Sequence, residues 1–412
     1  MRNSLLATAV VAALSLAPFS AVRAAGSVEH QVARFDGVSA AEIVHWREQP
    51  STLDVRPFQF DAQALSKRSR PITIDLGVGQ PLDVTPIQSQ TRDGMLIWEG
   101  VLTDFAKLGK KGEIAFDPMN SVTLVNDQGR ITGTIRVDGR LFKVRPLRAG
   151  GNVVIEVDES RMPVDHPAGA HMPDGPLAAA LANGELDSHG RAKANTVIRV
   201  MSVATQSAIS ASGGITALIN LAITEANQSY ANSGISITLQ NAGVYSTTYA
   251  ESGSMSTDLA RIRGTSDGYL DNVHSLRTQQ TADVVMFVIN NSASCGLASA
   301  IGASASTAFA AVHYDCATGY YSFGHEIGHL QAARHDPAND PSTSPYAFGH
   351  GYQQASKGWR TVMAYNCSPS CSRINYWSNP SKTYTGVAMG TTSTHDNARV
   401  LNLTRSTMAG FR

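Results

Sequence analysis

The fold of this chain is decided by one stretch, Tyr321-Ser322-Phe323-Gly324-His325-Glu326-Ile327-Gly328-His329-Leu330-Gln331-Ala332-Ala333-Arg334-His335-Asp336. On a helix, residues four positions apart lie on one face. His325 and His329 can therefore present imidazole nitrogens to one metal ion, with Glu326 beside them. A catalytic zinc ion needs three protein ligands and an open position for water. A third donor must therefore lie further along the chain.

His335 is the preferred third ligand. It lies too far round a continuous helix to face the same ion, so the chain must leave the helix near Ala332. Pro337 indicates that the helix has ended by then. No glutamate follows Glu326, which excludes an arrangement with a glutamate from a later helix. Three aspartates remain as alternative ligands: Asp336, Asp340 and Asp396.

The overall composition is that of a globular protein. The 412 residues include 33 basic and 33 acidic side chains, and 42% are hydrophobic. This balance indicates neither a nucleic-acid-binding surface nor a disordered acidic tail. Partners must be inferred from the candidate site.

The first 24 residues predict a secretory signal sequence. Arg2 is followed by an apolar run over residues 5–21, and Val22-Arg23-Ala24 offers small residues suited to signal peptidase. A membrane anchor is the alternative, but the run is shorter than the ~20 apolar residues that a span needs. No later stretch approaches that length. We therefore expect a secreted protein, extracellular or periplasmic, without a membrane partner in its mature form.

Three further regions follow. Residues 25–158 alternate short β-type runs with turn signals, which predicts a small antiparallel β domain. Its strands are expected at 71–76, 95–102, 121–125, 131–137 and 153–157. Residues 159–195 carry Pro163, Pro167, Pro173 and Pro176 and predict a linker or exposed processing region.

Residues 196–412 form the third region, where charge becomes sparse: 43 charged residues precede position 196 and 23 follow it. Strand-like and helix-like runs alternate at 196–203, 215–226, 235–239, 259–276 and 282–289. This order predicts an α/β domain with a mostly parallel twisted sheet and a zinc-binding active-site helix, preceded by the β-rich domain.

All four cysteines lie in the last third of the chain. An even count in an exported chain predicts disulfide bonds, and three pairings are possible. We favour Cys295 with Cys316 and Cys367 with Cys371, because each pair closes a local loop beside the candidate site.

Taken with these residues, the motif from His325 to Asp336 resembles that of the metzincins, in which HExxHxxGxxH is followed by Asp in the adamalysin (reprolysin) branch. Arg360-Thr361-Val362-Met363-Ala364-Tyr365 resembles the Met-turn that lies under the metal in these enzymes. The run from 361 to 380 looks most like bacterial secreted members near the peptidyl-Asp metalloendopeptidases. The resemblance covers about 196–412.

This resemblance implies an endopeptidase acting on proteins or peptides with one catalytic Zn²⁺. The ion would activate water and polarise the scissile carbonyl, while Glu326 acts as general base. Met363 would be a packing element. Tyr365 would stabilise the oxyanion, as in astacin-like members, or would be a core tyrosine. His313, in the β-type run 308–315, would lie in the edge strand that holds an extended peptide.

One position departs from the family pattern. Ala332 stands where the family usually has Gly, and a left-handed turn there would cost Ala about 1 kcal/mol. We expect the same turn with slight strain.

The first domain resembles the propeptides of such enzymes and is expected to inhibit its own enzyme. It holds no cysteine and cannot mask zinc with a thiolate. Asp165, His166 and His171 could block the metal, although solvated loop residues are the simpler interpretation. Cleavage before acidic residues would need a cation, for which Arg360, Arg373 and Lys382 are candidates. The alternative function is a secreted zinc-binding or adhesive protein without proteolytic activity.

Overall fold

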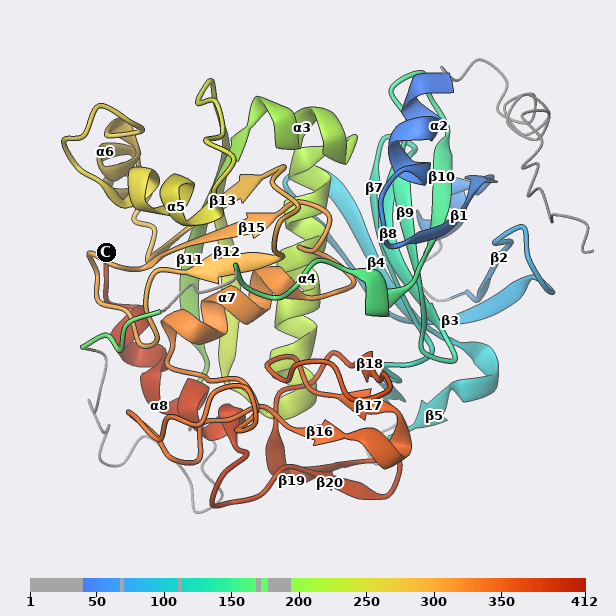
Figure 1. Cartoon of the computed structure of the whole chain (residues 1–412). Coiled ribbons are helices and arrows are strands. Elements are labelled where there is room, and N and C mark those ends of the chain that lie inside the picture. The colour runs from blue at the N-terminus through green and yellow to red at the C-terminus, as the bar shows by residue number, and fades with distance from the viewer. Residues whose placement is uncertain (1–39, 67–69, 110–112, 168–171, 177–193) are drawn as a thin grey trace, which may run out of the picture. The chain divides into compact units, whose positions relative to one another are not determined.

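The computed structural model describes residues 40–66, 70–109, 113–167, 172–176 and 194–412 (Figure 1). All of them belong to the compact unit Val38–Arg412. The expected signal sequence, residues 1–24, and the candidate His171 lie outside the described residues.

The first half of the chain forms an eight-stranded sheet in the order β1-β10-β9-β8-β7-β4-β3-β2. Every neighbouring pair is antiparallel. Its core includes the buried side chains of Trp98, Leu124 and Phe142. The strands are β1 (Thr52–Phe58), β2 (Ile72–Ile74), β3 (Leu82–Arg92), β4 (Met95–Leu102), β7 (Ser121–Asp127), β8 (Arg130–Val137), β9 (Arg140–Pro146) and β10 (Asn152–Val157).

Three of its hairpins turn on two-residue loops. Both residues of Asp93-Gly94, Gln128-Gly129 and Asp138-Gly139 have positive φ. Such turns match the right-handed twist of the flanking strands. The remaining elements of this half are the helix α2 (Ala40–Arg47), the short pair β5 (Lys107–Leu108) and β6 (Ile114–Ala115), and the 3₁₀ turns Ala62–Ser66, Thr103–Phe105 and Glu159–Arg161.

The second half contains a five-stranded sheet in the order β12-β11-β13-β15-β14. Three neighbouring pairs are parallel, and the edge strand β14 is antiparallel to β15. Buried apolar residues such as Met201, Phe287 and Phe309 form its core. The strands are β11 (Thr196–Thr205), β12 (Ile237–Thr247), β13 (Val284–Ile289), β14 (Gly296–Ala298) and β15 (Phe309–His313).

Six helices of the described chain belong to this half: α3 (Gln206–Ser212), α4 (Ile215–Ser233), α5 (Met255–Arg263), α6 (Asn272–Gln279), α7 (Ser322–Leu330) and α8 (Asn397–Met408). The long helix α4 lies between the two sheets (Figure 1). Ala217 and Leu221 of α4 pack against Met95, Ile97 and Val125 of the first sheet. Taken singly, no helix in the described ranges has the length and apolar character for a membrane span; only the bent pair α3–α4 meets those criteria together.

The single helix expected over 259–276 is wrong, because α5 and α6 are separate. Gly264 ends α5, and the Asp271 carboxylate accepts backbone N–H groups of Asp267 and Gly268 at 3.3 and 3.1 Å. Side-chain bonds of this kind offer the backbone an alternative to helical pairing.

The chain after α7 forms small sheets. Strands β16 (Gln353–Gln354), β17 (Trp359–Arg360) and β18 (Ser372–Arg373) pair with one another, as do β19 (Asn379–Tyr384) and β20 (Val387–Met389), and Ala355–Lys357 is a 3₁₀ turn. The first sheet also contacts the loop before α7, which holds Asp315. Lys143 on β9 pairs with Asp315 at 2.8 Å, and Arg136 on β8 donates to the carbonyl of Gly319 at 2.7 Å. The first half thus packs against the loop that leads into the candidate active-site helix.

Candidate active site

Helix α7 places the first two histidines one turn apart. The Nε2 atoms of His325 and His329 lie 3.1 Å from each other. The other ring nitrogens are held by backbone carbonyls: His325 Nδ1 by Val362 at 2.9 Å and His329 Nδ1 by Ala333 at 2.8 Å. Bonds of this type fix the tautomer and aim the remaining nitrogen at a metal.

The chain leaves α7 at Ala332, which has a φ of 74°. The N–H of Ala332 bonds to the carbonyl of His329 at 2.8 Å, and the N–H of Ala333 bonds to that of Gly328 at 2.9 Å. This pattern is a Schellman motif, whose left-handed residue is usually Gly. The left-handed turn expected at Ala332 is therefore present.

The turn brings His335 back to the helix. Its Nε2 atom lies 3.2 Å from Nε2 of His325 and 3.0 Å from Nε2 of His329. A tetrahedral zinc ion with bonds of about 2.0–2.1 Å would hold its ligand nitrogens about 3.3 Å apart. The three imidazoles therefore have the spacing and donor type that suit such an ion.

Burial sets the charge of this triad. All three rings are almost fully buried, and burial lowers the pKa of His325, His329 and His335 well below the ordinary value, with contributions from neighbouring imidazoles. Neutral imidazole is the form that binds a metal. Three neutral rings with facing lone pairs are a favourable arrangement only when a cation lies between them.

The three alternative aspartates have other partners. Asp336 accepts the backbone N–H of Tyr365 at 2.9 Å, Asp340 pairs with Arg334 at 2.9 Å, and Asp396 accepts the N–H of Arg399 at the start of α8. Among the described residues, the group able to share one ion consists of histidines alone.

Glu326 lies beside the triad and is 1% exposed. Burial raises its pKa, and its Oε2 atom has no hydrogen-bond partner within the described part of the chain. A Cβ on Gly296 of β14 would collide with this carboxylate, so Gly296 leaves the space that Glu326 fills. The sequence carries no signal for this role of Gly296, because the role depends on the packing of β14 against α7.

Met363 is fully buried and packs under α7. A Cβ on Gly328 would collide with Trp377 and contact the sulfur of Met363, so the helix can approach the Met-turn only because residue 328 is Gly. Tyr365, two residues on, places its ring 4.4 Å from that of His335. Its hydroxyl lies 3.3 Å from Nδ1 of His166.

A fourth histidine comes from the segment before β11. The ring of His166 lies 4.7–5.4 Å from the three triad rings, and its side chain is 7% exposed. Asp165 is also buried, and its carboxylate lies 2.6 Å from Arg373. The interpretation of Asp165 and His166 as solvated loop residues is therefore wrong, because both side chains pack into the site.

Of the other sequence candidates, Arg360 lies opposite Arg373 across β17 and β18, whereas His313 and Lys382 lie on other strands. The run containing His313 is β15, an inner strand, and the edge strand is β14, so that expectation is also wrong. Burial lowers the pKa of His313 to about 4. Arg360 is buried and donates to the carbonyl of Ala364 at 2.6 Å. Lys382, on β19, approaches Gly234.

Both favoured disulfides are present, Cys295–Cys316 and Cys367–Cys371. The first joins the start of β14 to the loop before α7. The second lies in the loop that leads into β18 and Arg373. Each therefore fixes a segment that borders the triad.

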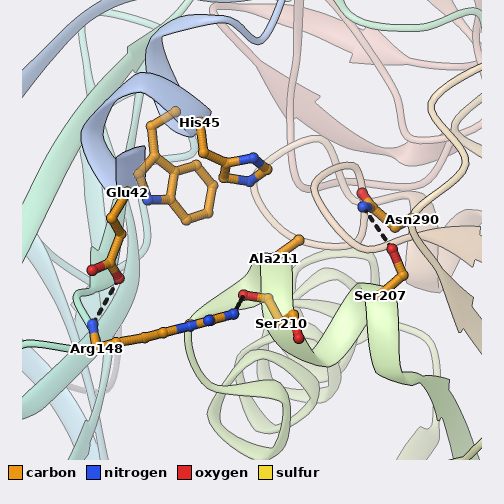
Figure 2. Close-up of a pocket in the computed structure, with 9 residues that line it drawn as sticks. Glu42, His45, Arg148, Ser207, Ser210, Ala211 and Asn290 are labelled. Atoms are coloured by element: carbon orange, nitrogen blue, oxygen red, sulfur yellow. Dashed lines mark hydrogen bonds between the residues drawn. The ribbon is translucent and has the colours of Figure 1, made fainter. Parts of the chain in front are cut away.

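Two hollows are possible sites for a substrate. A cavity of about 380 Å³ lies where α2 meets α3 (Figure 2). Across it Arg148 bonds both Glu42 and the carbonyl of Ser210, but none of the four histidines lines it. A cleft of about 580 Å³ is lined by His166, His335 and Tyr365 and reaches the triad. The second hollow is the one that a substrate would need to enter.

The chain is similar to a known peptidase family and to named peptidases. Residues 194–378 match the model Reprolysin_5, described as metallo-peptidase family M12. The peptidyl-Asp metalloendopeptidase of Stenotrophomonas maltophilia (strain K279a) is 49% identical over 380 residues, covering 88% of each chain. That of Xanthomonas campestris pv. campestris is 48% identical over 372 residues, covering 88% of this chain and 87% of the relative.

A solved structure is also similar. The crystal structure of metalloproteinase-II from Bacteroides fragilis has a TM-score of 0.44 and 15% identity, and covers 68% of this chain and 86% of that one. Residues 194–378 thus match the metallo-peptidase family M12, and by its likeness to the two sequence relatives the whole chain belongs to the family of the peptidyl-Asp metalloendopeptidases and is a zinc metalloendopeptidase.

Proposed function

We propose that the chain is secreted as an inactive precursor and, once processed, cleaves proteins with one Zn²⁺ held by His325, His329 and His335. The observation that carries this proposal is the convergence of three buried, neutral imidazole nitrogens beside a buried carboxylate. When bound, the ion would lower the pKa of a water molecule and polarise the scissile carbonyl.

The chain's own groups supply the proton transfers. Glu326 takes the proton of the attacking water and delivers it to the leaving amine, for which its raised pKa suits it. The Tyr365 hydroxyl donates to the oxygen that develops negative charge. Burial, with Asp165 and Glu326 nearby, raises the pKa of Tyr365, so the hydroxyl keeps its proton.

We propose that the enzyme prefers substrates with an acidic residue directly after the scissile bond. Two observations support it. The relatives are named peptidyl-Asp metalloendopeptidases. In this chain, the fully buried guanidinium of Arg373 lies beside the site and binds a carboxylate.

The inactive precursor is supported by the position of the segment around His166. It passes next to α7 (Figure 1), and the Nε2 atom of His166 lies 3.4 Å from Oε1 of Glu326. A side chain there excludes water from the general base. The first sheet and this segment would thus act as the enzyme's own inhibitor until they are removed.

Digestion of casein by the processed form, meaning the chain after loss of its first half, tests the function. We expect about one zinc per chain by elemental analysis, loss of cleavage with a chelator and recovery when Zn²⁺ is added back. A chain that binds zinc but cleaves neither casein nor peptides would instead be a zinc-binding or adhesive protein.

A further inference from the structure

Residues 163–167 lie along the free edge of the five-stranded sheet. The N–H of Cys295 donates to the carbonyl of Val164 at 2.7 Å, and the N–H of Gly296 donates to that of Asp165 at 3.0 Å. Gly296 begins β14, an edge strand of this sheet, and Cys295 directly precedes it. Peptides bound by proteases and other proteins often add to a sheet edge in this way.

The far end of the same segment is fixed as well. The N–H of Ile301 donates to the carbonyl of Pro173 at 3.0 Å, and Asp174 forms a parallel bridge with Ile301. The guanidinium of Arg334 pairs with the Asp174 carboxylate. Both described ends of the segment are therefore bound to the rim of the site.

Asp165 is held by Arg373, whose guanidinium is fully buried. Its Nη2 atom lies 2.6 Å from Oδ2 of Asp165. The catalytic half fixes Arg373 independently, through the carbonyls of Tyr320 and Ala364 at 3.2 and 3.3 Å and the face of the Tyr320 ring at 4.3 Å. The catalytic half therefore holds Arg373 in place by its own contacts, and Asp165 binds to a guanidinium that is already fixed.

The positive charge of the buried Arg373 guanidinium requires a carboxylate at this position. Asp165 and Arg373 are both buried, and their side chains lie 2.6 Å apart, so each is the buried counter-charge of the other. Within the described ranges, Asp165 is the carboxylate that forms an ion pair with Arg373. A buried guanidinium without a counter-charge is unfavourable. When the segment leaves, Arg373 therefore favours another carboxylate in the same place.

His166, the next residue, points at the triad. One ligand atom from each of His166, His325, His329 and His335 fits within a group spanning 4.8 Å. Within the described residues, the Nε2 atom of His166 has no partner with hydrogen-bond geometry, although it lies 3.4 Å from Oε1 of Glu326, and its Nδ1 lies 3.3 Å from the hydroxyl of Tyr365. A buried nitrogen without a hydrogen bond, beside three converging imidazoles, suits a fourth metal ligand.

We infer that Asp165 and His166 form a two-point internal plug, in which Asp165 occupies the subsite for the acidic substrate side chain on Arg373 and His166 is the fourth imidazole on the metal. The inference rests on the proposed function, since it needs an ion at the triad. Because the two residues are adjacent, the acidic subsite lies one residue from the metal. Arg373 is then the residue that selects the side chain after the scissile bond.

The subsite is tested in the full chain carrying Glu326→Gln, which prevents self-cleavage. Asp165→Ala should lower Tm, and N-acetyl-aspartyl amide should raise it again by about 1 °C or more at saturation, whereas N-acetyl-asparaginyl amide should not. Asp174→Ala, in the same segment, is the matched control and should show no preference for the aspartyl probe. Equal responses to the two probes in Asp165→Ala would overturn the subsite.

Selectivity is tested in the processed form. Arg373→Gln should lower the ratio of kcat/KM for a peptide with Asp after the scissile bond to that for its Asn counterpart by about 100-fold or more. Arg373→Lys keeps the charge and should lose less, although its ammonium cannot reproduce the guanidinium contacts. A ratio unchanged in Arg373→Gln would remove Arg373 from the subsite.

The fourth ligand is tested by spectroscopy of the same Glu326→Gln full chain loaded with Co²⁺, whose visible absorption reports ligand number and type. His166→Ala should change the spectrum and weaken Co²⁺ retention at least about tenfold. His274→Ala, a histidine that bonds the carbonyl of Gly264, should change neither. An unchanged spectrum in His166→Ala would overturn this half of the inference. If the proposed function is wrong, the result is different: the chain binds no metal, or it shows no cleavage that a chelator abolishes.

Discussion

Asp336 accepts the backbone N–H of Tyr365 at 2.9 Å, so the residue after the third imidazole is tied directly to the turn that carries Met363. Asn339 donates to the same carboxylate at 2.9 Å. The Asp336 carboxylate therefore joins two segments through hydrogen bonds, and its role is structural instead of metal-binding.

The first prediction follows from that division of roles. In a full chain that also carries His166→Ala, His335→Ala should lower zinc affinity by more than about 100-fold. Replacing even a residue that only hydrogen-bonds to a metal ligand lowers metal affinity about 10–100-fold. Asp336→Ala should lower it by less than about tenfold. It should, however, reduce the free energy of unfolding by about 1–3 kcal/mol, since two donors lose their acceptor. Chelator competition and denaturant titration measure the two effects. If Asp336→Ala strips the metal while His335→Ala retains it, the histidine triad is refuted.

The second prediction concerns Ala332, at a φ of 74°. Ala332→Gly relieves about 1 kcal/mol of left-handed strain but removes a buried methyl worth about the same. Stability should change by less than about 1 kcal/mol, and activity should stay equal or rise slightly. Ala333→Gly is the control, because Ala333 is also buried but has no positive φ. This change removes a buried methyl group and adds backbone freedom to the unfolded chain without relieving strain, so the free energy of unfolding should fall by about 1–2 kcal/mol. Equal losses in both variants, measured by denaturant unfolding, would contradict the strain argument.

The third prediction concerns the general base. Glu326→Gln should keep about one zinc per chain and lower kcat by about 10²–10⁴-fold in the processed form, because only the proton-transfer group is removed. Elemental analysis and casein digestion check both statements. Cleavage at the parent's rate would mean that another group takes the proton.

The fourth prediction concerns acid stability. Burial alone would raise the pKa of Asp315, but Lys143 and Arg145 lower it to about 2. A depressed pKa adds stability above the unfolded value of about 4, and this stability is lost as pH falls toward 2. The full Glu326→Gln chain should lose about 2 kcal/mol over that window through this one group.

Replacement of both partners, Lys143→Met with Asp315→Asn, is the control for this effect. It removes the titrating carboxylate together with Lys143, and it leaves the buried guanidinium of Arg145, which lies 4.0 Å from Asp315 in the parent chain. Denaturant unfolding of the double variant should therefore depend less steeply on pH between 4 and 2. If the free energy of unfolding depends on pH in the same way in both chains, protonation of Asp315 does not weaken the contact between the two halves.

The fifth prediction concerns processing. The active form should begin between residues 189 and 197. Thr196 starts β11 and its N–H bonds the carbonyl of Ser236 at 2.9 Å, so cleavage well past this point would remove part of a central strand. Mass spectrometry of the active enzyme gives the start. An active species that still begins at Ala25 would show that the first half is not a removable propeptide.

The parts of the site that could be predicted depend on local geometry. The period of a helix brings His325 and His329 together, and Pro337 limits how far that helix can extend. The same local argument located the turn at Ala332. Strand 95–102 coincides with β4, because its apolar run is long and bounded by turn residues.

What could not be predicted depends on contacts between distant segments. Strand β14 has three residues, too few for a recognisable pattern, and its role comes from its place at the sheet edge. Asp165 and His166 sit among prolines and small residues that are typical of a solvated loop. Their burial results from Arg373 and the triad, more than 150 positions away in sequence.

The short strand β14 has a consequence for the precursor's behaviour in solution. A free sheet edge offers unpaired N–H and C=O groups to any other chain, and proteins limit the resulting aggregation with short or covered edges. Here the edge is short, and the backbone of the segment around Asp165 and Asp174 pairs with it at both ends. This edge is therefore already covered in the full chain, and the processing proposed above would open it to other polypeptides.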